Sequence, residues 1–274
     1  MAGTSVNTNL AALVALRTLG TVTTDLNSTQ KRISTGFNVA DGFDNGAIFA
    51  IAQSVRNSIA GVTAVNSELK GSQGLVSVAN ASLTQVSDLM TQVRDILTRL
   101  ADQSVTSDTR NQLASQYTFL MATINNNLTT AVYQGTNLVN SSGSLGVIQD
   151  VLANQLTFQG QLSTVGTLVT NLSVVGATSI TSAGSFLLNT FLTELNLLAT
   201  SLNTVGSLNQ AVANQVKFNS GIQDALTTGL SALVDANLPA ESARLASLQV
   251  KQQLSTQSLT IANNNQQLLL TLFR

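Results

Sequence analysis

The sequence predicts a mainly α protein: an elongated antiparallel helical bundle or coiled coil, with a small β-hairpin insert at its tip and paired N- and C-terminal helices. Two long apolar heptad stripes indicate helices that pack lengthwise against each other. The only proline lies at position 239, so no proline interrupts the preceding helices. The stretch 134–185 lacks a heptad pattern and holds 7 of the 18 glycines, which indicates turns and short strands.

Residues 1–33 are predicted to form the N-terminal helix. Apolar residues fall on one face of this segment, namely Leu16, Leu19, Leu26 and Ile33. The stripe is thin and almost uncharged toward its start, so this helix alone would be marginal in water. Residues 34–44 follow as a linker. We therefore expect the N-terminal helix to need a partner.

Residues 45–133 are predicted to form a first helical layer. Steps of three and four residues give the apolar stripe Val62, Val65, Leu69, Ser72, Val76, Ala79, Leu83, Val86, Met90, Val93, Leu97 and Leu100, which only Ser72 interrupts. A helix from Asn45 to Leu100 would be about 80 Å long at 1.5 Å per residue. A shorter stripe, Leu113, Tyr117, Leu120 and Ile124, follows the cap candidates Ser107 and Asp108.

Residues 134–185 form the predicted β-rich insert, in which 156–158 and 168–175 are β-prone runs. Residues 186–237 are predicted to return as a second helical layer, because a second stripe runs from Leu188 to Leu233. Three amides interrupt this stripe at expected core positions and are interpreted as residues that fix the helix register: Asn209, Asn219 and Gln223.

Residues 238–274 are predicted to form the C-terminal helix. Pro239 and Glu241 are typical of a first helical turn. Leu254, Ile261 and Leu268 then recur at seven-residue steps. The order helix, helix, β insert, helix, helix brings the two terminal segments together, and we expect them to pack on each other and then on other copies of the chain.

Composition excludes several classes of function. The chain has no Cys, His or Trp and a net charge of −1 with 9% charged residues, against about 25% in ordinary soluble proteins. Thiolate nucleophiles, zinc fingers and His-based triads are therefore excluded. The absence of a basic cluster argues against nucleic-acid binding. We predict no enzyme activity, no catalytic or metal site and no cofactor.

Membrane and targeting signals are also weak. The uncharged stretch 151–193 is broken by Gly, Thr, Ser, Asn and Gln, so no membrane insertion is expected. The first charged residue is Arg17, so the start lacks the basic region of a cleaved signal peptide. Asp41, Asp44 and Asn45 could be taken for a metal or glycosidase carboxylate set. We favour a linker turn with a helix cap.

Two groups of motifs lie near the ends of the chain. The N-terminal motifs are 5–9, 30–36, 44–45, 50–52 and Arg56, and the C-terminal motifs are 241–245, 249–254, 258–259, 261–263 and 272–274. Their most informative residues are Asn7, Asn9, Arg32, Ser34, Gly36, Asn45, Arg56, Glu241, Arg244, Gln253, Asn263 and Arg274. In this order at the two ends, these motifs specifically resemble those of bacterial flagellins.

The resemblance implies a structural subunit that self-assembles into the helical flagellar filament used for bacterial swimming, here as a short form without large outer domains. It further implies that the segments 1–33 and 238–274 line an inner tube. The implied partners are other copies of the chain, the flagellar export machinery and a chaperone, and the cap and hook-associated proteins. The implied location is extracellular, after export without a cleaved N-terminal signal peptide.

Three other functions remain open on residues alone. A hook–filament junction protein would share flagellin-like ends but would not polymerise indefinitely. An intracellular helical bundle would share the heptad stripes. A type III-secreted translocator would share the low charge and the absence of Cys, but it would need a hydrophobic hairpin for membranes, which the sequence lacks.

Overall fold

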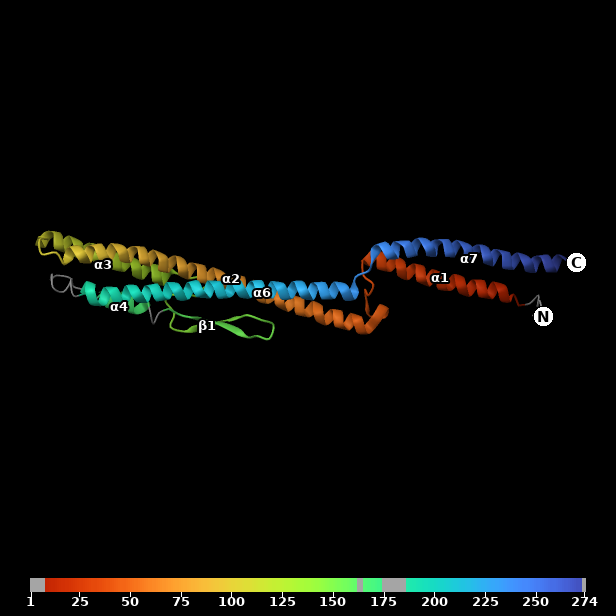
Figure 1. The fold of residues 1–274 in the computed structure, drawn as a ribbon, viewed down its shortest axis with the longest axis horizontal. Coiled ribbons are helices and arrows are strands. Elements are labelled where there is room, and N and C mark those ends of the chain that lie inside the picture. The colour runs from red at the N-terminus through yellow and green to blue at the C-terminus, as the bar shows by residue number, and fades with distance from the viewer. Residues whose placement is uncertain (1–7, 162–164, 174–185, 273–274) are drawn as a thin grey trace. The chain divides into compact units, whose positions relative to one another are not determined.

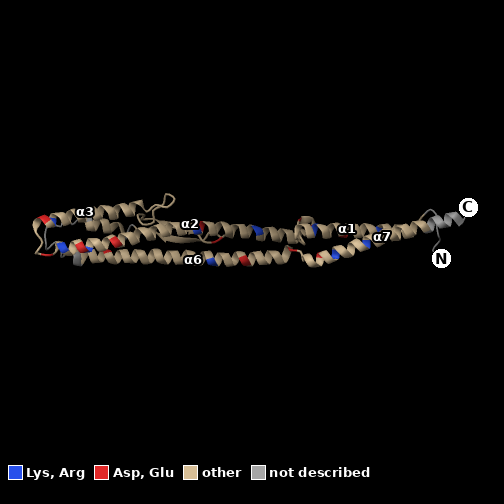
Figure 2. Cartoon of the chain, turned by 90° about the horizontal axis from the view of Figure 1, so that it is seen from above, with Lys and Arg blue, Asp and Glu red and all other residues tan. Residues whose placement is uncertain are grey.

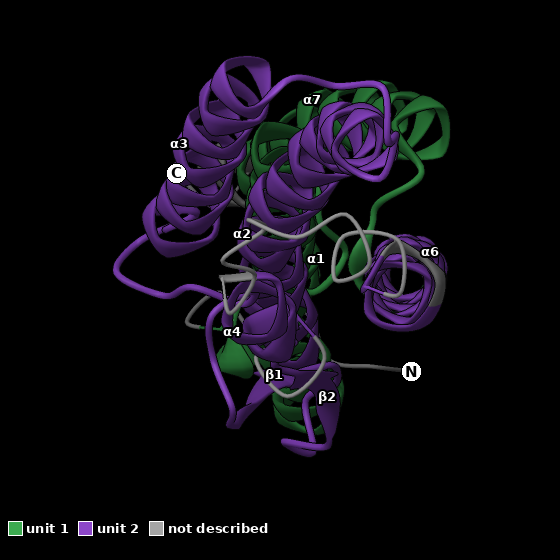
Figure 3. Ribbon diagram, turned by 90° about the vertical axis from the view of Figure 1, so that its left-hand side faces the viewer, with its two compact units in different colours: residues 1–57, 225–274 green, residues 58–224 purple. Residues whose placement is uncertain are grey.

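The computed structural model describes residues 8–161, 165–173 and 186–272, and the chain falls into two compact units (Figure 3). Unit 1 comprises residues 1–57 and 225–274, and unit 2 comprises residues 58–224. These divisions lie within helices, whereas the sequence placed its boundaries at 44/45 and 237/238. A mainly α fold with a small antiparallel hairpin is confirmed.

Unit 1 is built on two terminal helices, α1 (Leu10–Thr35) and α7 (Leu238–Leu272), which run side by side (Figure 1). Asn9 caps α1, because its side-chain oxygen accepts a hydrogen bond from the backbone N–H of Ala12. Asn237 precedes α7 and accepts a hydrogen bond from Ala240 in the same way. We refer to these two helices as the α1–α7 pair.

The segment after α1 is held by backbone hydrogen bonds to the junction before α7. Gly36 ends α1 in the left-handed conformation (φ 75°), which glycine adopts without strain. Its carbonyl accepts a bond from Ala236 N, and Asn38 N donates to Val234 O at 2.7 Å. α2 (Gly42–Leu100) begins one turn before an extended Asn45, whose side chain accepts from Ile48 N. The predicted helix start near Asn45 is therefore a capped kink within α2.

Unit 2 is organised by the apolar stripe of α2. Every apolar position of the predicted stripe from Val62 to Leu100 is buried. α3 (Ser107–Thr130) buries its own predicted residues Leu113, Tyr117, Leu120 and Ile124 in the same core. The cap of α3 is Thr106, which accepts from Thr109 N, rather than the predicted Ser107 or Asp108.

The hairpin pairs β1 (Ser144–Ile148) with β2 (Gln155–Gln159), and Gly146 lies opposite Thr157. Phe158 is fully buried, which confirms the β-prone run at 156–158. The hairpin lies along the flank of α2 and α6 (Leu192–Val234) rather than at a tip, because its turn contacts both helices. Side-chain amides on α6 hold it there.

The second β-prone run forms a helix in its described part. α4 (Thr167–Ser173) replaces the predicted strand over 168–173, while 174–175 lie outside the described residues. Leu168 and Leu172 are four residues apart and both buried, and the Tyr117 hydroxyl donates to Leu172 O. Burial of one helical face therefore overrides the local β preference. A short π-helix, η2 (Leu187–Phe191), then leads into α6.

Substitution of glycine by alanine is expected to have opposite effects on the stability of unit 2 at two positions of α2. A Cβ at Gly74 would lie 2.6 Å from Tyr133 Cζ, whereas a Cβ at Gly71 would have no neighbouring atom within 4 Å. We expect Gly74→Ala to lower the melting temperature of unit 2 and Gly71→Ala to raise it, because Ala is favoured over Gly in a helix by about 1 kcal/mol. Tyrosine fluorescence reads unit 2 directly, since both tyrosines lie there and the chain has no Trp. Equal shifts for the two variants would contradict this expectation.

Candidate assembly surface

The α1–α7 pair buries a narrow seam within the chain. Val22 and Leu26 of α1 pack on Leu248 of α7, with Leu245 at the edge. Ala15 and Thr29 extend the buried positions along α1. The spacing of these residues follows one helical face. Small and medium side chains therefore join the two helices, and much of their remaining apolar surface faces outward.

The predicted inner-tube residues divide between this seam and the outer surface. Leu26 is buried, and Leu19 and Ile33 are half-buried. Leu16, Leu254 and Ile261 are 58%, 63% and 54% exposed. The side chain of Leu268 lies outside the described residues. Each helix of the pair covers only the part of the other helix that faces it. Leu16, Leu254 and Ile261 are therefore available to pack on other chains.

Further apolar side chains widen this outer surface. Leu10, Leu13, Val14 and Val250 are exposed as well. A groove of about 570 Å³ lies between α1 and α7, and it is lined by Leu10, Ala11, Val14, Ala15, Thr18, Ser255 and Ser258. Charged groups are thinly spread over the helices (Figure 2). Such a contiguous apolar surface is typical of a site that binds another protein.

Two polar contacts fix α1 against α7. Asn9 Nδ2 donates to Ala262 O at 2.9 Å, and Arg32 Nη1 lies 3.3 Å from Glu241 Oε1. These contacts lie toward opposite ends of α1. Arg32 also carries the carbonyl that accepts from Gly36 N at the end of the helix. Four of the flagellin-like signature residues, Asn9, Arg32, Gly36 and Glu241, thus set the register or the ends of the pair.

The other signature residues have varied places. Asn45 caps the second segment of α2. Arg56 is half-buried, and Ser34, Arg244, Gln253 and Asn263 are exposed. Asn7 and Arg274 lie outside the described residues. The exposed members make no seam contact that would explain them within one chain.

An ion cluster braces the linker between α1 and α2. Lys31 Nζ lies 2.7 Å from Asp41 Oδ2 and 2.9 Å from Asp44 Oδ1. Asp41 also accepts from Phe43 N, and Asp44 accepts from Ala40 N. These bonds confirm the interpretation as a linker turn. No group of three or more Asp and Glu residues that could hold a metal ion occurs within the described ranges.

Acidification is expected to loosen this turn. The hydrogen bond from Lys31 holds the pKa of both Asp41 and Asp44 below the ordinary value of 3.8. A lowered carboxyl pKa stabilises the folded turn above that value, and the contribution is lost as pH falls through the lowered pKa. Amide hydrogen exchange at Phe43, corrected for intrinsic rates, should therefore be slow at pH 5 and faster near pH 2.

The matched variant Asp41→Asn, Asp44→Asn should remove that pH dependence, because neither side chain then titrates. The protection of its Phe43 amide should be the same at both pH values, because an Asn side-chain oxygen accepts hydrogen bonds at either pH. Protection in the unsubstituted chain that persists unchanged to pH 2 would contradict a bracing role for the carboxylates.

The three amides interpreted as register residues differ in environment. Asn219 is 2% exposed, and its Nδ2 donates to Gln149 O at 3.0 Å. Gln215 Nε2 donates to the same carbonyl and to Asn219 Oδ1. Gln223 is half-buried, whereas Asn209 is exposed rather than buried as expected. Asn219 therefore fixes the hairpin against α6, a role that spacing alone did not reveal.

Sequence patterns did not single out Arg110. This residue is buried in unit 2, and its guanidinium donates to the carbonyls of Leu100, Asp102 and Val105 at the turn between α2 and α3. Arg110 lies in a polar part of the sequence after Asp108, where a charged side chain is expected to lie at the surface. Its one available signal was its position on the stripe of α3, three residues before Leu113.

Comparison with known proteins agrees with this architecture. The family model of the bacterial flagellin N-terminal helical region matches residues 6–144, and the model of the bacterial flagellin C-terminal helical region matches residues 189–273. The first model alone covers more than half of the chain. The two matched segments flank residues 145–188, which contain almost all of the hairpin and α4.

Relatives of similar length match along the whole chain. Flagellin FljO of Caulobacter vibrioides is 31% identical over 100% of both chains, and a flagellin of Brucella melitensis is 34% identical over 98% of this chain and 99% of its own. A solved flagellar hook-associated protein of Vibrio parahaemolyticus shares the fold, with a TM-score of 0.58 and 11% identity over 70% of this chain and all of its own. The chain therefore belongs to the bacterial flagellin family, as a short form of the filament subunit whose length leaves no room for a large outer domain.

Proposed function

We propose that this flagellin builds its filament chiefly through the outer surface of the α1–α7 pair. The observation that carries the proposal is the exposure of Leu16, Leu254 and Ile261 on helices already joined by a separate seam. Burial of apolar surface is worth about 25 cal/mol per Å², so contact with further copies would stabilise the pair. The terminal helices then become the inner tube of the filament.

Low charge suits this mode of packing. Identical helices packed in parallel place identical side chains near one another, and like charges would repel at each repeat. With 9% charged residues, this chain largely avoids such repulsion. The contact must also be heterologous, since only head-to-tail surfaces produce an open helical polymer.

The proposal places the chain outside the cell, in the filament that drives swimming. Its partners are other copies of itself and, as the family resemblance implies, the export machinery, a chaperone, and the cap and hook-associated proteins. Export without a cleaved N-terminal signal peptide remains a prediction. No observation favours the alternative role at the hook–filament junction, because the likeness to a hook-associated protein concerns the fold alone.

Flagellins are structural proteins, and we propose no enzyme activity, metal site or cofactor for this one. α2 contains an 18-residue window with a mean hydropathy of 1.2, long and apolar enough to cross a membrane by composition. Only 17% of that window is buried within the chain, whereas the stripe from Val62 to Leu100 of the same helix packs in the core of unit 2. Membrane insertion and nucleic-acid binding have no part in the proposal.

Seeded polymerisation of the purified chain tests the function. Filament fragments added to monomer should elongate into long filaments visible by electron microscopy, with a residual monomer concentration independent of the total. Growth that stops after one added layer would instead indicate a junction adaptor. A chain that remains monomeric with its terminal helices fully protected from hydrogen exchange would overturn the proposal.

A further inference from the structure

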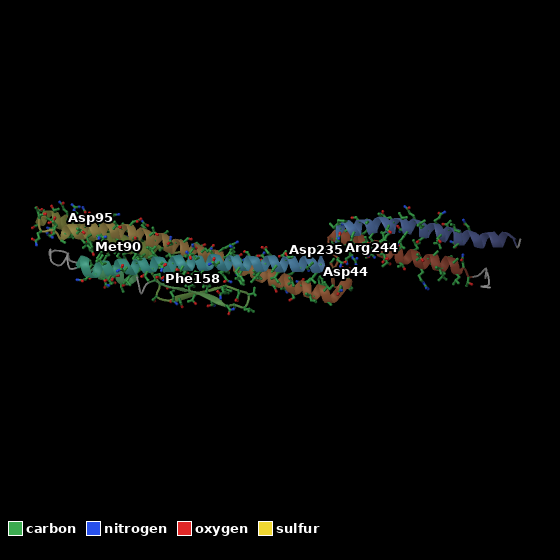
Figure 4. All side chains as sticks on the ribbon, in the orientation of Figure 1. Asp44, Met90, Asp95, Phe158, Asp235 and Arg244 are labelled. Carbon is green, nitrogen blue, oxygen red and sulfur yellow. The ribbon has the colours of Figure 1, made fainter. Side chains whose placement is uncertain are left out.

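The kink near the start of α2 carries an asparagine that is directly followed by glycine. Asn45 and Gly46 form the single Asn-Gly pair of the sequence, and both residues are exposed. Figure 4 marks Asp44, the residue before this pair. In water, an asparagine loses its side-chain amide most readily when glycine follows it, because glycine has no side chain to hinder the attacking backbone nitrogen. By this criterion, the most reactive amide of the chain lies at the kink.

The surroundings of this pair leave it open to water. A Cβ built at Gly46 would meet no atom within 4 Å apart from the backbone of its own helix. Asn45 is extended (φ −162°, ψ 102°) and interrupts the regular helical conformation of α2. The backbone at Asn45 is therefore not held by a continuous helix, as it would be farther along α2.

The cap at the kink nevertheless holds Asn45 in an unreactive geometry. Deamidation requires Gly46 N to approach the side-chain carbon Cγ of Asn45, so that a five-membered ring can close. With ψ at 102°, the bond from the Asn45 carbonyl carbon to Gly46 N points away from the side chain. The Asn45 side-chain oxygen also accepts a hydrogen bond from Ile48 N at 3.1 Å. Ring closure therefore needs a rotation about the Cα–C bond of Asn45 and the loss of this cap.

The ion cluster of Lys31, Asp41 and Asp44 restrains the same segment. Asp44 directly precedes Asn45, and its Oδ2 accepts hydrogen bonds from Ala40 N at 2.9 Å and from Asp41 N at 3.2 Å. Lys31 of α1 lies 2.9 Å from the other oxygen of Asp44. Rotation at Asn45 moves the chain next to this anchored residue. The ion cluster and the cap should therefore both slow ring closure.

We propose that Asn45 is a site of spontaneous deamidation, and that the cap and the ion cluster set its rate. Gly46 N loses its proton to water and forms a bond to Cγ of Asn45. The bond from Cγ to Nδ2 breaks, Nδ2 takes up a proton and leaves as ammonia, and a succinimide remains. Water then adds to either carbonyl of the ring and opens it to aspartate or isoaspartate. One water is consumed and one ammonia is released, and no oxidant or reductant takes part.

The two products have different effects on the kink. An aspartate formed at this position can still accept from Ile48 N, because Asp and Asn are equally good helix caps. It adds a third carboxylate beside the two that already contact Lys31. Isoaspartate instead inserts a methylene group into the backbone and removes the cap geometry. Deamidation thus changes the charge and the path of the linker, an effect that goes beyond the proposed function and does not depend on it.

Peptide mapping of the folded chain after incubation at neutral pH tests the site. Trypsin cleaves after Arg32 and Arg56 and releases the peptide 33–56, which contains Asn45 and the exposed Asn38. Fragmentation should show the mass change from amide to acid at Asn45, and none at Asn38, which precedes a bulky Val. Digestion in heavy-oxygen water labels any deamidation that occurs after unfolding, so that it can be subtracted. An unchanged Asn45, or equal conversion of both asparagines, overturns the proposal.

Gly46→Ala is the matched variant for the chemistry. The added methyl group has open space in the fold but hinders attack by the backbone nitrogen, so conversion of Asn45 should become undetectable over the same period. Near-UV and far-UV circular dichroism should stay unchanged. Conversion at the rate of the unsubstituted chain would show that the acid arises by another route.

A second pair of variants tests control by the ion cluster. Lys31→Met should raise the rate of deamidation roughly 5-fold, since one restraint of this kind contributes about as much as a helix cap. Loss of a positive charge alone would slow removal of the Gly46 proton, so a faster reaction reports the opening of the linker. Lys70→Met removes the same charge at an exposed position of α2 and should leave the rate unchanged. Equal rates for the two variants, or for the folded chain and the chain unfolded in guanidinium, would overturn control by the fold.

Discussion

Deletion of residues 240–274 is expected to abolish filament formation while unit 2 stays folded. The deletion removes almost all of α7, including Glu241, which pairs with Arg32, and Leu248, which packs on Val22 and Leu26. α1 then has no intramolecular partner, and a single amphipathic helix of 26 residues is marginal in water. Tyrosine fluorescence should still report a cooperative transition, because both tyrosines lie in unit 2.

A point variant separates the outer surface from the seam. Leu254→Asp places a charge at an exposed position of α7, so the α1–α7 pair should remain, yet the critical concentration should rise roughly 100-fold or more because that charge would be buried unpaired between copies. Thr256→Asp adds the same charge two residues along and away from that stripe, and should have a smaller effect. Polymerisation of the deletion variant, or equal effects of the two point variants, would show that other surfaces build the filament.

Heptad spacing predicted the core of unit 2 well because helix geometry and burial there have the same period. Each apolar residue from Val62 to Leu100 that falls on the stripe is buried, and the exception at Ser72 was visible in advance. The helices before residue 239 can also be long, because no proline interrupts them. The sequence therefore predicted the order of α2 and α3 and the face that each of these helices buries.

Contacts between distant segments could not be obtained in this way. Residues 168–173 have β-prone side chains, but their position beside Tyr117 favours a helix with Leu168 and Leu172 on one face. The flank position of the hairpin depends on Asn219, which periodicity marked as a core amide without identifying its partner. Spacing shows which face of a helix is apolar, but it does not show which segment packs on that face.

The terminal stripes show the same limit at the site itself. Leu26 and Leu254 belong to equivalent patterns, yet the first lies in the seam of the pair and the second faces outward. The sequence predicted that both helices need partners. It could not divide the stripe between the partner within the chain and the partners in other chains, because both kinds of contact select apolar residues at the same period.

Replacement of Arg110 is expected to be the most damaging single change in unit 2. Its guanidinium donates to three backbone carbonyls at the end of α2 and in the following turn, at 3.0 Å to Asp102 O and 3.4 Å to Val105 O as well as to Leu100 O. Carbonyls at a helix C-terminus lack partners within the helix. Arg110→Met keeps much of the apolar stem but removes every donor, and should lower the free energy of unfolding by about 3 kcal/mol.

Arg99→Met is the matched control, because Arg99 lies in the last turn of α2 with an exposed side chain and a 3.9 Å ion pair to Asp95. Such surface pairs contribute about 0.5 kcal/mol or less. Urea unfolding followed by tyrosine fluorescence should therefore separate the two variants clearly. Arg110→Lys should fall between them, since one ammonium group cannot match the planar fork that reaches several carbonyls at once. If Arg110→Met unfolds at the same urea concentration as Arg99→Met, the turn is held by the apolar packing of Leu97, Leu100 and Leu113, and the buried guanidinium adds nothing beyond its stem.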